Sequence, residues 1–259
     1  MSNNSLLTDL ENKILVKTDP FPFAAPKNFL PNELVLTAEK EFNKFANSID
    51  DGNARYQRFK SGFADYEKMP ETIKKIIKLF YSREFIEILE RKFDLKGIEP
   101  DWTLHGGGMH QSNTNGYLKV HSDFVYKRKS KQRRVLNLLL YLNSKWEKDW
   151  NGSLELWSKD MSVMKTKIEP ILNNVVIFRT DQDSNHGFPD PLKCPSHVSR
   201  KSIALYYYVK EKSFFPFKIK RRKLFHAVWK KRKGVEEPTF ADQDSFFKRL
   251  KHKFFFRFF

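Results

Sequence analysis

The segment YLKVHSDF, Tyr117–Phe124, places a histidine and an aspartate two residues apart after an apolar stretch. Residues i and i+2 of a β-strand point to the same face of its sheet. His121 and Asp123 would therefore lie side by side if the strand continues through them. Taken alone, the pair has two interpretations: a polar strand end, which is the commoner case, or half of a metal site. The segments around it decide between them.

Short apolar runs surround this segment between residues 101 and 210. They are rich in β-branched, leucine and aromatic residues, and polar residues separate them, which is typical of strands in a sandwich or barrel. Upstream, the apolar residues of Glu33–Ala46 and of the segment from Pro70 to residue 95 repeat at helical spacing. The sequence predicts an α+β chain that is mainly β, with helices within residues 30–95 and a β block over 101–210. The predicted strands are WTLHGGGMHQ, GYLKVHSDF, RRVLNLLLYLN, GSLELWS, NNVVIFRT and RKSIALYYYV.

A third ligand candidate follows the apolar run VVIFR, whose polar continuation ends in His186. Two histidines and one carboxylate on neighbouring strands can occupy one face of an octahedral ion and leave positions open for substrate and oxygen, as in non-haem Fe(II) oxygenases. Cys194 is the only cysteine, which argues against a structural zinc site. The last predicted strand begins with Arg200 and Lys201. A cation at that position would pair with a carboxylate of a co-substrate.

Taken in order, these segments resemble the prolyl-hydroxylase-like branch of the Fe(II)- and 2-oxoglutarate-dependent dioxygenases. GYLKVHSDF resembles the strand with the H-x-D pair, and LLLYLNSKWEKDWNGSLELW resembles the strand ending in Tyr-Leu-Asn with the glycine-led strand after it. IEPILNNVVIFRTDQDSNHGF resembles the segment with the distal histidine, and RKSIALYYYV the arginine-led closing strand. The lead-in PFPFAAPKNFLPNEL is also similar to this branch. The resemblance implies a double-stranded β-helix, a jelly-roll or cupin-like barrel, buttressed by the N-terminal helices.

The resemblance also implies the roles of individual residues. His121, Asp123 and His186 would bind Fe(II), Arg200 would bind the distal carboxylate of 2-oxoglutarate, and Tyr141 would hydrogen-bond to the same carboxylate. Lys201 is the alternative to Arg200, but adjacent strand residues point to opposite faces, so only one can reach the site; the family's spacing favours Arg200. The implied reaction consumes O2, hydroxylates an unactivated C–H bond of a protein (prolyl-type), small-molecule or glycan substrate, and forms succinate and CO2. The prime substrate and the oligomeric state stay open.

Other polar residues near these segments have weaker claims. Gln111 is a candidate for facing the co-substrate or substrate. His105 and His110 are interpreted as loop or core histidines, and Cys194 as an inert thiol in a Pro/Lys-rich loop.

The formal charge of +17 is concentrated at the C-terminus. From Lys210 to Phe259 the chain has 16 Lys and Arg against 5 Asp and Glu, together with 12 of its 25 phenylalanines. We therefore divide the chain into a flexible N-terminus (1–20), a dioxygenase domain (21–210) and a basic, Phe-rich extension (211–259). The extension is expected to contact an anionic membrane surface, and nucleic acid ranks below that as a partner. Neither a secretory signal nor a spanning stretch is recognised, so a cytoplasmic protein, peripheral at the membrane, is expected.

Two other function classes are compatible with the same strands. One is a non-catalytic jelly-roll protein that docks on anionic membrane or nucleic acid through its basic aromatic tail. The other is a cupin-type metal-dependent isomerase or hydrolase, against which the arginine-led last strand argues.

Overall fold

The computed structural model describes residues 3–45, 57–127, 130–210 and 225–237. Within these ranges, no helix is both long enough and apolar enough to cross a membrane. The α-helices are α1 (Asn3–Lys13), α2 (Asn32–Phe45), α3 (Glu71–Phe80) and α4 (Arg83–Phe93). The strands are β1 (Phe23–Ala24), β2 (Gln57–Phe63), β3 (Ile98–Pro100), β4 (Gly108–Ser122), β5 (Tyr126–Lys127), β6 (Gln132–Tyr141), β7 (Leu154–Trp157), β8 (Met164–Ile168), β9 (Val175–Arg179), β10 (Asn185–Phe188), β11 (Arg200–Lys210) and β12 (Val228–Trp229).

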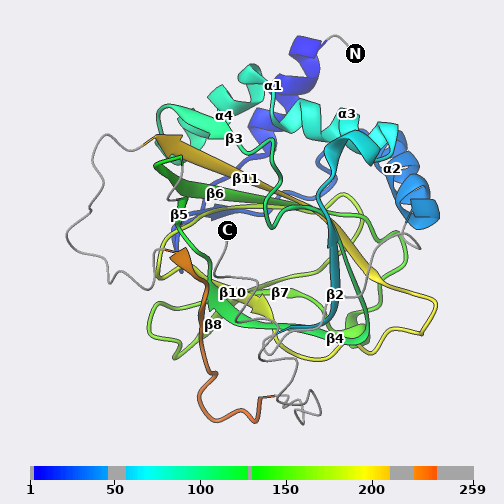
Figure 1. Ribbon diagram of the computed structural model, residues 1–259, viewed down its shortest axis with the longest axis vertical. Helices are drawn as coiled ribbons and strands as arrows, with labels where there is room; N and C mark the ends of the chain where they lie inside the picture. The colour runs from blue at the N-terminus through cyan, green and yellow to red at the C-terminus, as the bar shows by residue number, and fades with distance from the viewer. Residues whose placement is uncertain (1–2, 46–56, 128–129, 211–224, 238–259) are drawn as a thin grey trace, which may run out of the picture.

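The strands form one curled antiparallel sheet whose main order is β1-β9-β6-β11-β4-β10-β7-β8. The first half of β4 pairs with β11 and its last part pairs with β10, so β4 belongs to both layers of the curled sheet. Figure 1 shows β6 and β11 in one layer and β7, β8 and β10 in the other. This is a mainly-β jelly-roll architecture, and the predicted fold class is confirmed.

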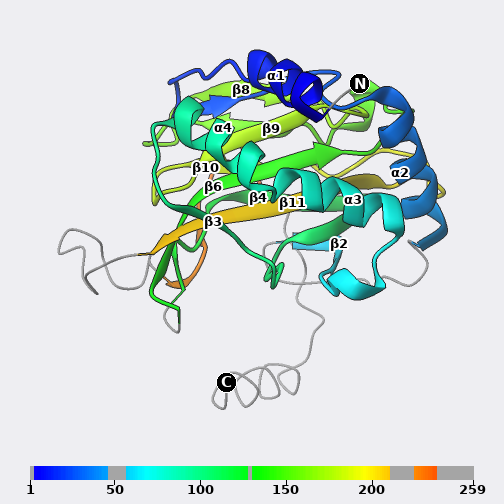
Figure 2. The same cartoon turned by 90° about the horizontal axis from the view of Figure 1, so that it is seen from above.

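The helices cover the outer face of the layer that contains β6 and β11 (Figure 2). Alternation along β6 explains the contact: Leu138 and Leu140 belong to the core cluster under the helices, whereas Leu139 packs with the cluster inside the curled sheet. On the helix side, α3 buries Ile73 and Ile77 one turn apart in the first cluster. The helices therefore buttress the sheet, as predicted.

The N-terminal third differs from the prediction in two respects. The segment predicted to be flexible contains α1, and Leu10 and Ile14 are fully buried in the main core. The region predicted to hold helices, residues 30–95, also supplies a strand, because β2 pairs with β4, and upstream of that region β1 pairs with β9. β1 has only two residues, and the sequence of β2, QRFKSGF, has no apolar alternation, so periodicity could not find either.

Part of the C-terminal extension returns to the sheet. β12 pairs with the end of β4. The Arg232 Nη1 is 2.8 Å from Asp190 Oδ1, and its Nε is 3.0 Å from Glu237 Oε1. The other parts of the predicted basic, Phe-rich extension, residues 211–224 and 238–259, lie outside the described residues. Membrane contact and cellular location therefore stay predictions.

Candidate active site

Three of the predicted site residues meet where β4 pairs with β10. His121 lies directly opposite His186 in the register of these strands, and Asp123 follows the end of β4. One ligand atom of each residue lies within 4.8 Å of the other two. The Nε2 of His121 is 3.5 Å from Asp123 Oδ1, and the Nε2 of His186 is 3.6 Å from Asp123 Oδ2. The structure thus brings together the two halves of the site that the sequence separates by more than sixty residues.

Backbone carbonyls fix the tautomer of both imidazoles. The Nδ1 of His121 is 2.9 Å from the Lys119 oxygen, and the Nδ1 of His186 is 2.9 Å from the Ser184 oxygen. A carbonyl oxygen can only accept, so each Nδ1 carries a proton and each Nε2 faces Asp123. Burial, and then the neighbouring His121, lower the pKa of His186 to about 4, so this ring is neutral at pH 7. Imidazoles oriented through their second nitrogen are the arrangement that metal ligands adopt.

Asp123 is held as a carboxylate by groups that the sequence analysis did not identify. Its Oδ2 accepts a hydrogen bond from Asn137 Nδ2 at 2.8 Å and lies 3.1 Å from Arg134 Nη2. Burial raises the pKa of Asp123, but the charge of Arg134 is the largest opposing effect, and the pKa lies well below its usual range. Arg134 is only 1 % exposed, and its guanidinium lies 3.4 Å from the ring centroid of Tyr206. The carboxylate is therefore ionised and oriented before any ligand binds.

A β-bulge explains why Arg134 was missed. In the pairing of β6 with β11, Leu136 is opposite Tyr207 and Arg134 is opposite Tyr208, so the residue between Leu136 and Arg134 is an extra one. Simple alternation would place Arg134 and Asn137 on opposite faces. The bulge turns Arg134 to the inner side, where its Nε donates to Asn137 Oδ1 at 2.6 Å. Long-range register of this kind has no signal within the strand's own sequence.

Arg200 approaches the same cavity from the start of β11. Its Nη2 donates to the Tyr141 hydroxyl at 3.2 Å and its Nε donates to the Gly152 oxygen at 2.7 Å. The guanidinium lies between the rings of Tyr141 and Phe188, 4.9 and 4.2 Å from their centroids. Gly152 has φ +81°, and a Cβ there would lie 3.2 Å from the Arg200 Cδ, so glycine is required for this contact. Arg200 and Tyr141, both predicted to contact the same carboxylate, are hydrogen-bonded to each other.

The next residue on β11, Lys201, lies on the opposite face of the sheet. It pairs with Gln111 of β4, and both line a separate surface groove. Only Arg200 reaches the triad, as the alternation of a strand requires. The same alternation corrects the interpretation of Gln111, which faces away from the triad, while its neighbour His110 lines the triad cavity.

The cavity around the triad has a volume of about 250 Å³. Trp229 of β12 is opposite His121, with the two ring centroids 4.7 Å apart, so the C-terminal extension supplies one wall. Lys60 of β2 and His110 of β4 supply another. None of these three was predicted, and a two-residue strand such as β12 has no sequence pattern by which it could be. We call this space the triad cavity; its charged and aromatic lining includes Lys60, His110, His121, Asp123, Phe124, Arg134, Phe178, His186, Phe188, Arg200, Tyr206 and Trp229.

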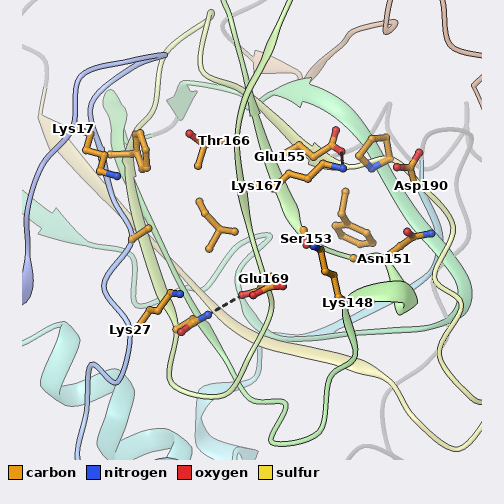
Figure 3. Close-up of a pocket in the computed structure, with 17 residues that line it drawn as sticks. Lys17, Lys27, Lys148, Asn151, Ser153, Glu155, Thr166, Lys167, Glu169 and Asp190 are labelled. Atoms are coloured by element: carbon orange, nitrogen blue, oxygen red, sulfur yellow. Dashed lines mark hydrogen bonds and ion pairs between the residues drawn. The ribbon is translucent and has the colours of Figure 1, made fainter.

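A larger hollow of about 430 Å³ adjoins the triad cavity (Figure 3). Lys17, Lys27 and Lys148 lie around it, and Lys167 pairs with Glu155 at 3.2 Å. The ring of Phe188 lines both spaces and forms part of the wall between them. The His121, Asp123 and His186 cluster, found in the described part of the chain, lies in the smaller of the two cavities. The candidate active site is therefore identified by its metal-ligand side chains and not by cavity volume.

Residues 107–208 match the model of the 2OG-Fe(II) oxygenase superfamily. The match over this segment favours an Fe(II)- and 2-oxoglutarate-dependent dioxygenase over the binding-protein and cupin-type alternatives. A search of curated protein sequences finds no significant match.

Solved structures of prolyl hydroxylases share the fold of this oxygenase. A prolyl-4-hydroxylase from Pseudomonas putida has a TM-score of 0.53 and 16% identity, covering 81% of this chain and 98% of that one. A prolyl 4-hydroxylase from Phytophthora capsici has a TM-score of 0.53 and 17% identity, with 95% and 75% covered. A Trichoplax adhaerens prolyl hydroxylase, in complex with a hypoxia inducible factor peptide, has a TM-score of 0.50 and 17% identity, with 79% and 88% covered. These likenesses show that the chain has the fold of the branch to which the sequence resemblance pointed.

The residues of the triad cavity fit the cofactor and co-substrate of this family. Ligand atoms on neighbouring positions of an octahedral ion, each at about 2.1 Å, lie about 3 Å apart. The 3.5 and 3.6 Å separations from Asp123 to His121 and His186 differ from this by a few tenths of an ångström. The donor set of two imidazoles and one carboxylate suits Fe(II). Arg200 offers a cation to a carboxylate in the same cavity, and the buried Tyr141 hydroxyl hydrogen-bonds to that cation.

Proposed function

We propose that this oxygenase hydroxylates an unactivated C–H bond of a prolyl-type protein residue, a small molecule or a glycan, with succinate and CO2 as co-products. One observation carries the proposal: His121, Asp123 and His186 converge in a cavity that Arg200 also lines, with the buried Tyr141 hydrogen-bonded to Arg200. Fe(II), when bound, supplies the activation of O2 and the oxidative decarboxylation of 2-oxoglutarate.

The chain's own residues would bind and orient the co-substrate. The Tyr141 hydroxyl accepts from Arg200, which leaves its proton for donation to an incoming carboxylate. Burial raises the pKa of Tyr141, so the hydroxyl stays protonated at neutral pH. Because Arg200 is 5 % exposed and Tyr141 fully buried, an ion pair formed there is screened little by water.

The inner wall would keep water from the reacting groups. Leu139, Leu154 and Phe178 line the triad cavity from β6, β7 and β9. At about 250 Å³ the cavity lies below the usual volume of a small-molecule site, about 300–1,000 Å³. It therefore has room for the co-substrate and the reacting part of a prime substrate, whose bulk would remain outside. A peptide meets that requirement, which supports the prolyl-type option.

Anaerobic titration tests the proposal. Chelator-treated protein is titrated with Fe(II) and then 2-oxoglutarate while the weak visible absorption of an iron-bound 2-oxo acid is recorded. We expect the band in the wild type, its loss in Asp123→Ala, and at least a tenfold weaker 2-oxoglutarate midpoint in Arg200→Met. Asp183→Ala removes a carboxylate paired with the exposed Lys159 and should behave as the wild type. A folded wild type without the band, or full activity in Asp123→Ala, would refute the proposal.

A further inference from the structure

Lys60 lies in the same cross-strand row as Arg200. It is opposite Ser112 of β4, and Ser112 is opposite Arg200 of β11. Residues directly opposite in an antiparallel sheet point to the same face, so Lys60 and Arg200 both point to the face that encloses the triad cavity, two strands apart. Lys60 lies outside residues 107–208, the segment matched by the family model.

The ammonium of Lys60 has no hydrogen-bond or ion-pair partner among the residues that the structure describes. Burial, and then the charge of Arg200, lower its pKa from 10.5 to about 8, and Asp123 offsets this only in part. Lys60 is half-buried, and an ammonium partly desolvated without a partner is unfavourable in the free protein. An anion bound beside it would remove that cost, which is the property of a preorganised binding group.

The side chains that line the triad cavity carry more positive than negative charge. Its cations are Lys60, Arg134 and Arg200, and in the described part of the chain Asp123 is its one carboxylate. His110 is neutral, because burial, Lys60 and Arg200 lower its pKa well below the usual value. A divalent metal and the 2-oxoglutarate dianion cancel each other, so loading the site leaves the excess of positive charge unchanged.

The carboxylate that Arg200 would bind does not also neutralise Lys60. Its guanidinium is turned toward β6 and the loop before β7, where it contacts Tyr141 and Gly152. Lys60 comes from the other side of β11, beyond β4. The two cations therefore serve the cavity from opposite sides, and one distal carboxylate on Arg200 and Tyr141 does not neutralise Lys60.

We propose that Lys60 binds a carboxylate of the prime substrate, so that this oxygenase acts on an acidic molecule or an acidic residue of a peptide. The proposal rests on the proposed function and names the substrate class of the same site. Lys60 is a binding residue in this scheme, and its strand β2, supplied by the N-terminal third, carries the selectivity.

The first measurement asks which carboxylate Lys60 recognises. Zn(II)-loaded protein is titrated by calorimetry with 2-oxoglutarate and with 2-oxopentanoate, which replaces the distal carboxylate by a methyl group. The Lys60→Met variant should bind each within about twofold of the wild type. A tenfold loss confined to 2-oxoglutarate would assign Lys60 to the co-substrate and overturn the proposal.

The second measurement supplies a carboxylate probe to the loaded site. Trifluoroacetate and its neutral analogue trifluoroacetamide are added to protein saturated with Zn(II) and 2-oxoglutarate, and binding is followed by fluorine NMR. We expect Lys60-dependent binding of trifluoroacetate alone, weakened at least tenfold in Lys60→Met and retained in Lys60→Arg. The control Lys201→Met removes a lysine on the opposite face and should change nothing.

The outcomes separate the two proposals. Binding of trifluoroacetate unchanged in Lys60→Met, with normal 2-oxoglutarate binding, overturns the role of Lys60 and leaves the proposed function standing. A wild type that fails to bind 2-oxoglutarate but binds trifluoroacetate through Lys60 overturns the proposed function and supports the anion site.

Discussion

Replacing Arg134 by methionine would remove the charge that holds Asp123 ionised while keeping most of the buried volume. The Nη2–Oδ2 distance is 3.1 Å, and the Arg134 side chain is 1% exposed. Two unit charges at that distance attract by about 5 kcal/mol at an effective dielectric constant of about 20. Removal of one partner of a buried pair typically costs about 3–5 kcal/mol. Because Asn137 still donates to the carboxylate, we expect a loss near the lower end, about 3 kcal/mol, in the free energy of unfolding of the metal-free protein.

Metal should reduce this loss, because a divalent ion bound by Asp123 neutralises the carboxylate that Arg134 leaves. The assay is urea unfolding at pH 7.5, followed by circular dichroism, with EDTA and again with saturating Mn(II). Arg133→Met is the matched control: this neighbouring arginine does not line the triad cavity, and its replacement should change stability by less than about 1 kcal/mol. Equal losses for the two variants in EDTA, or an Arg134→Met loss that Mn(II) does not change, would refute the reasoning.

Three further outcomes follow from other contacts. Between pH 8 and 10.5 the unfolded chain binds a proton at Lys60 that the folded protein does not. The unfolding free energy of the wild type should therefore rise relative to that of Lys60→Met by about 1–2 kcal/mol from pH 7.5 to 10. A free-energy difference between the two proteins that stays constant over this pH range in urea titrations contradicts this. Gly152→Ala places a Cβ 2.7 Å from Leu192 and 3.2 Å from Arg200 in a left-handed conformation, so calorimetry should show weaker 2-oxoglutarate binding, with unaltered affinity as the contrary result. Ser82→Ala removes the hydroxyl that accepts from Phe85 N at the start of α4 and should lower the unfolding free energy by about 1 kcal/mol without affecting 2-oxoglutarate binding.

The parts of the site that sequence could predict are those whose placement is local. His121 lies near the end of β4 and Asp123 directly after it, so the local chain brings the two together, and the two-residue period of β11 separates Arg200 from Lys201. The helices were equally accessible: residues 33–46 were predicted and α2 spans Asn32–Phe45. In these cases the deciding interaction lies within a few residues, so the sequence pattern contains it.

The residues that were missed depend on pairing between distant strands. Arg134 reaches Asp123 only through the bulge in β6, and Trp229 contacts His121 only because β12 returns to β4. Lys60 enters the cavity on a polar strand that pairs with the side of β4 away from β11. Each of these placements is decided by register with a partner far along the chain, which no local period encodes.

The same dependence on register explains why the cross-strand row of Lys60 and Arg200 shares one small cavity with the metal ligands. Between the pairs Lys60–Ser112 and Arg58–Tyr117, β2 advances by two residues while β4 advances by five. The three extra residues would lengthen a regular strand by about 10 Å. Because they bulge out instead, the row that holds Lys60 and Arg200 is drawn toward His121, near the other end of β4. In the proposed function, the irregularity in β4 would therefore allow a co-substrate bound at Arg200 to reach the metal ligands, and would give β2, a strand from outside the matched segment, access to the substrate.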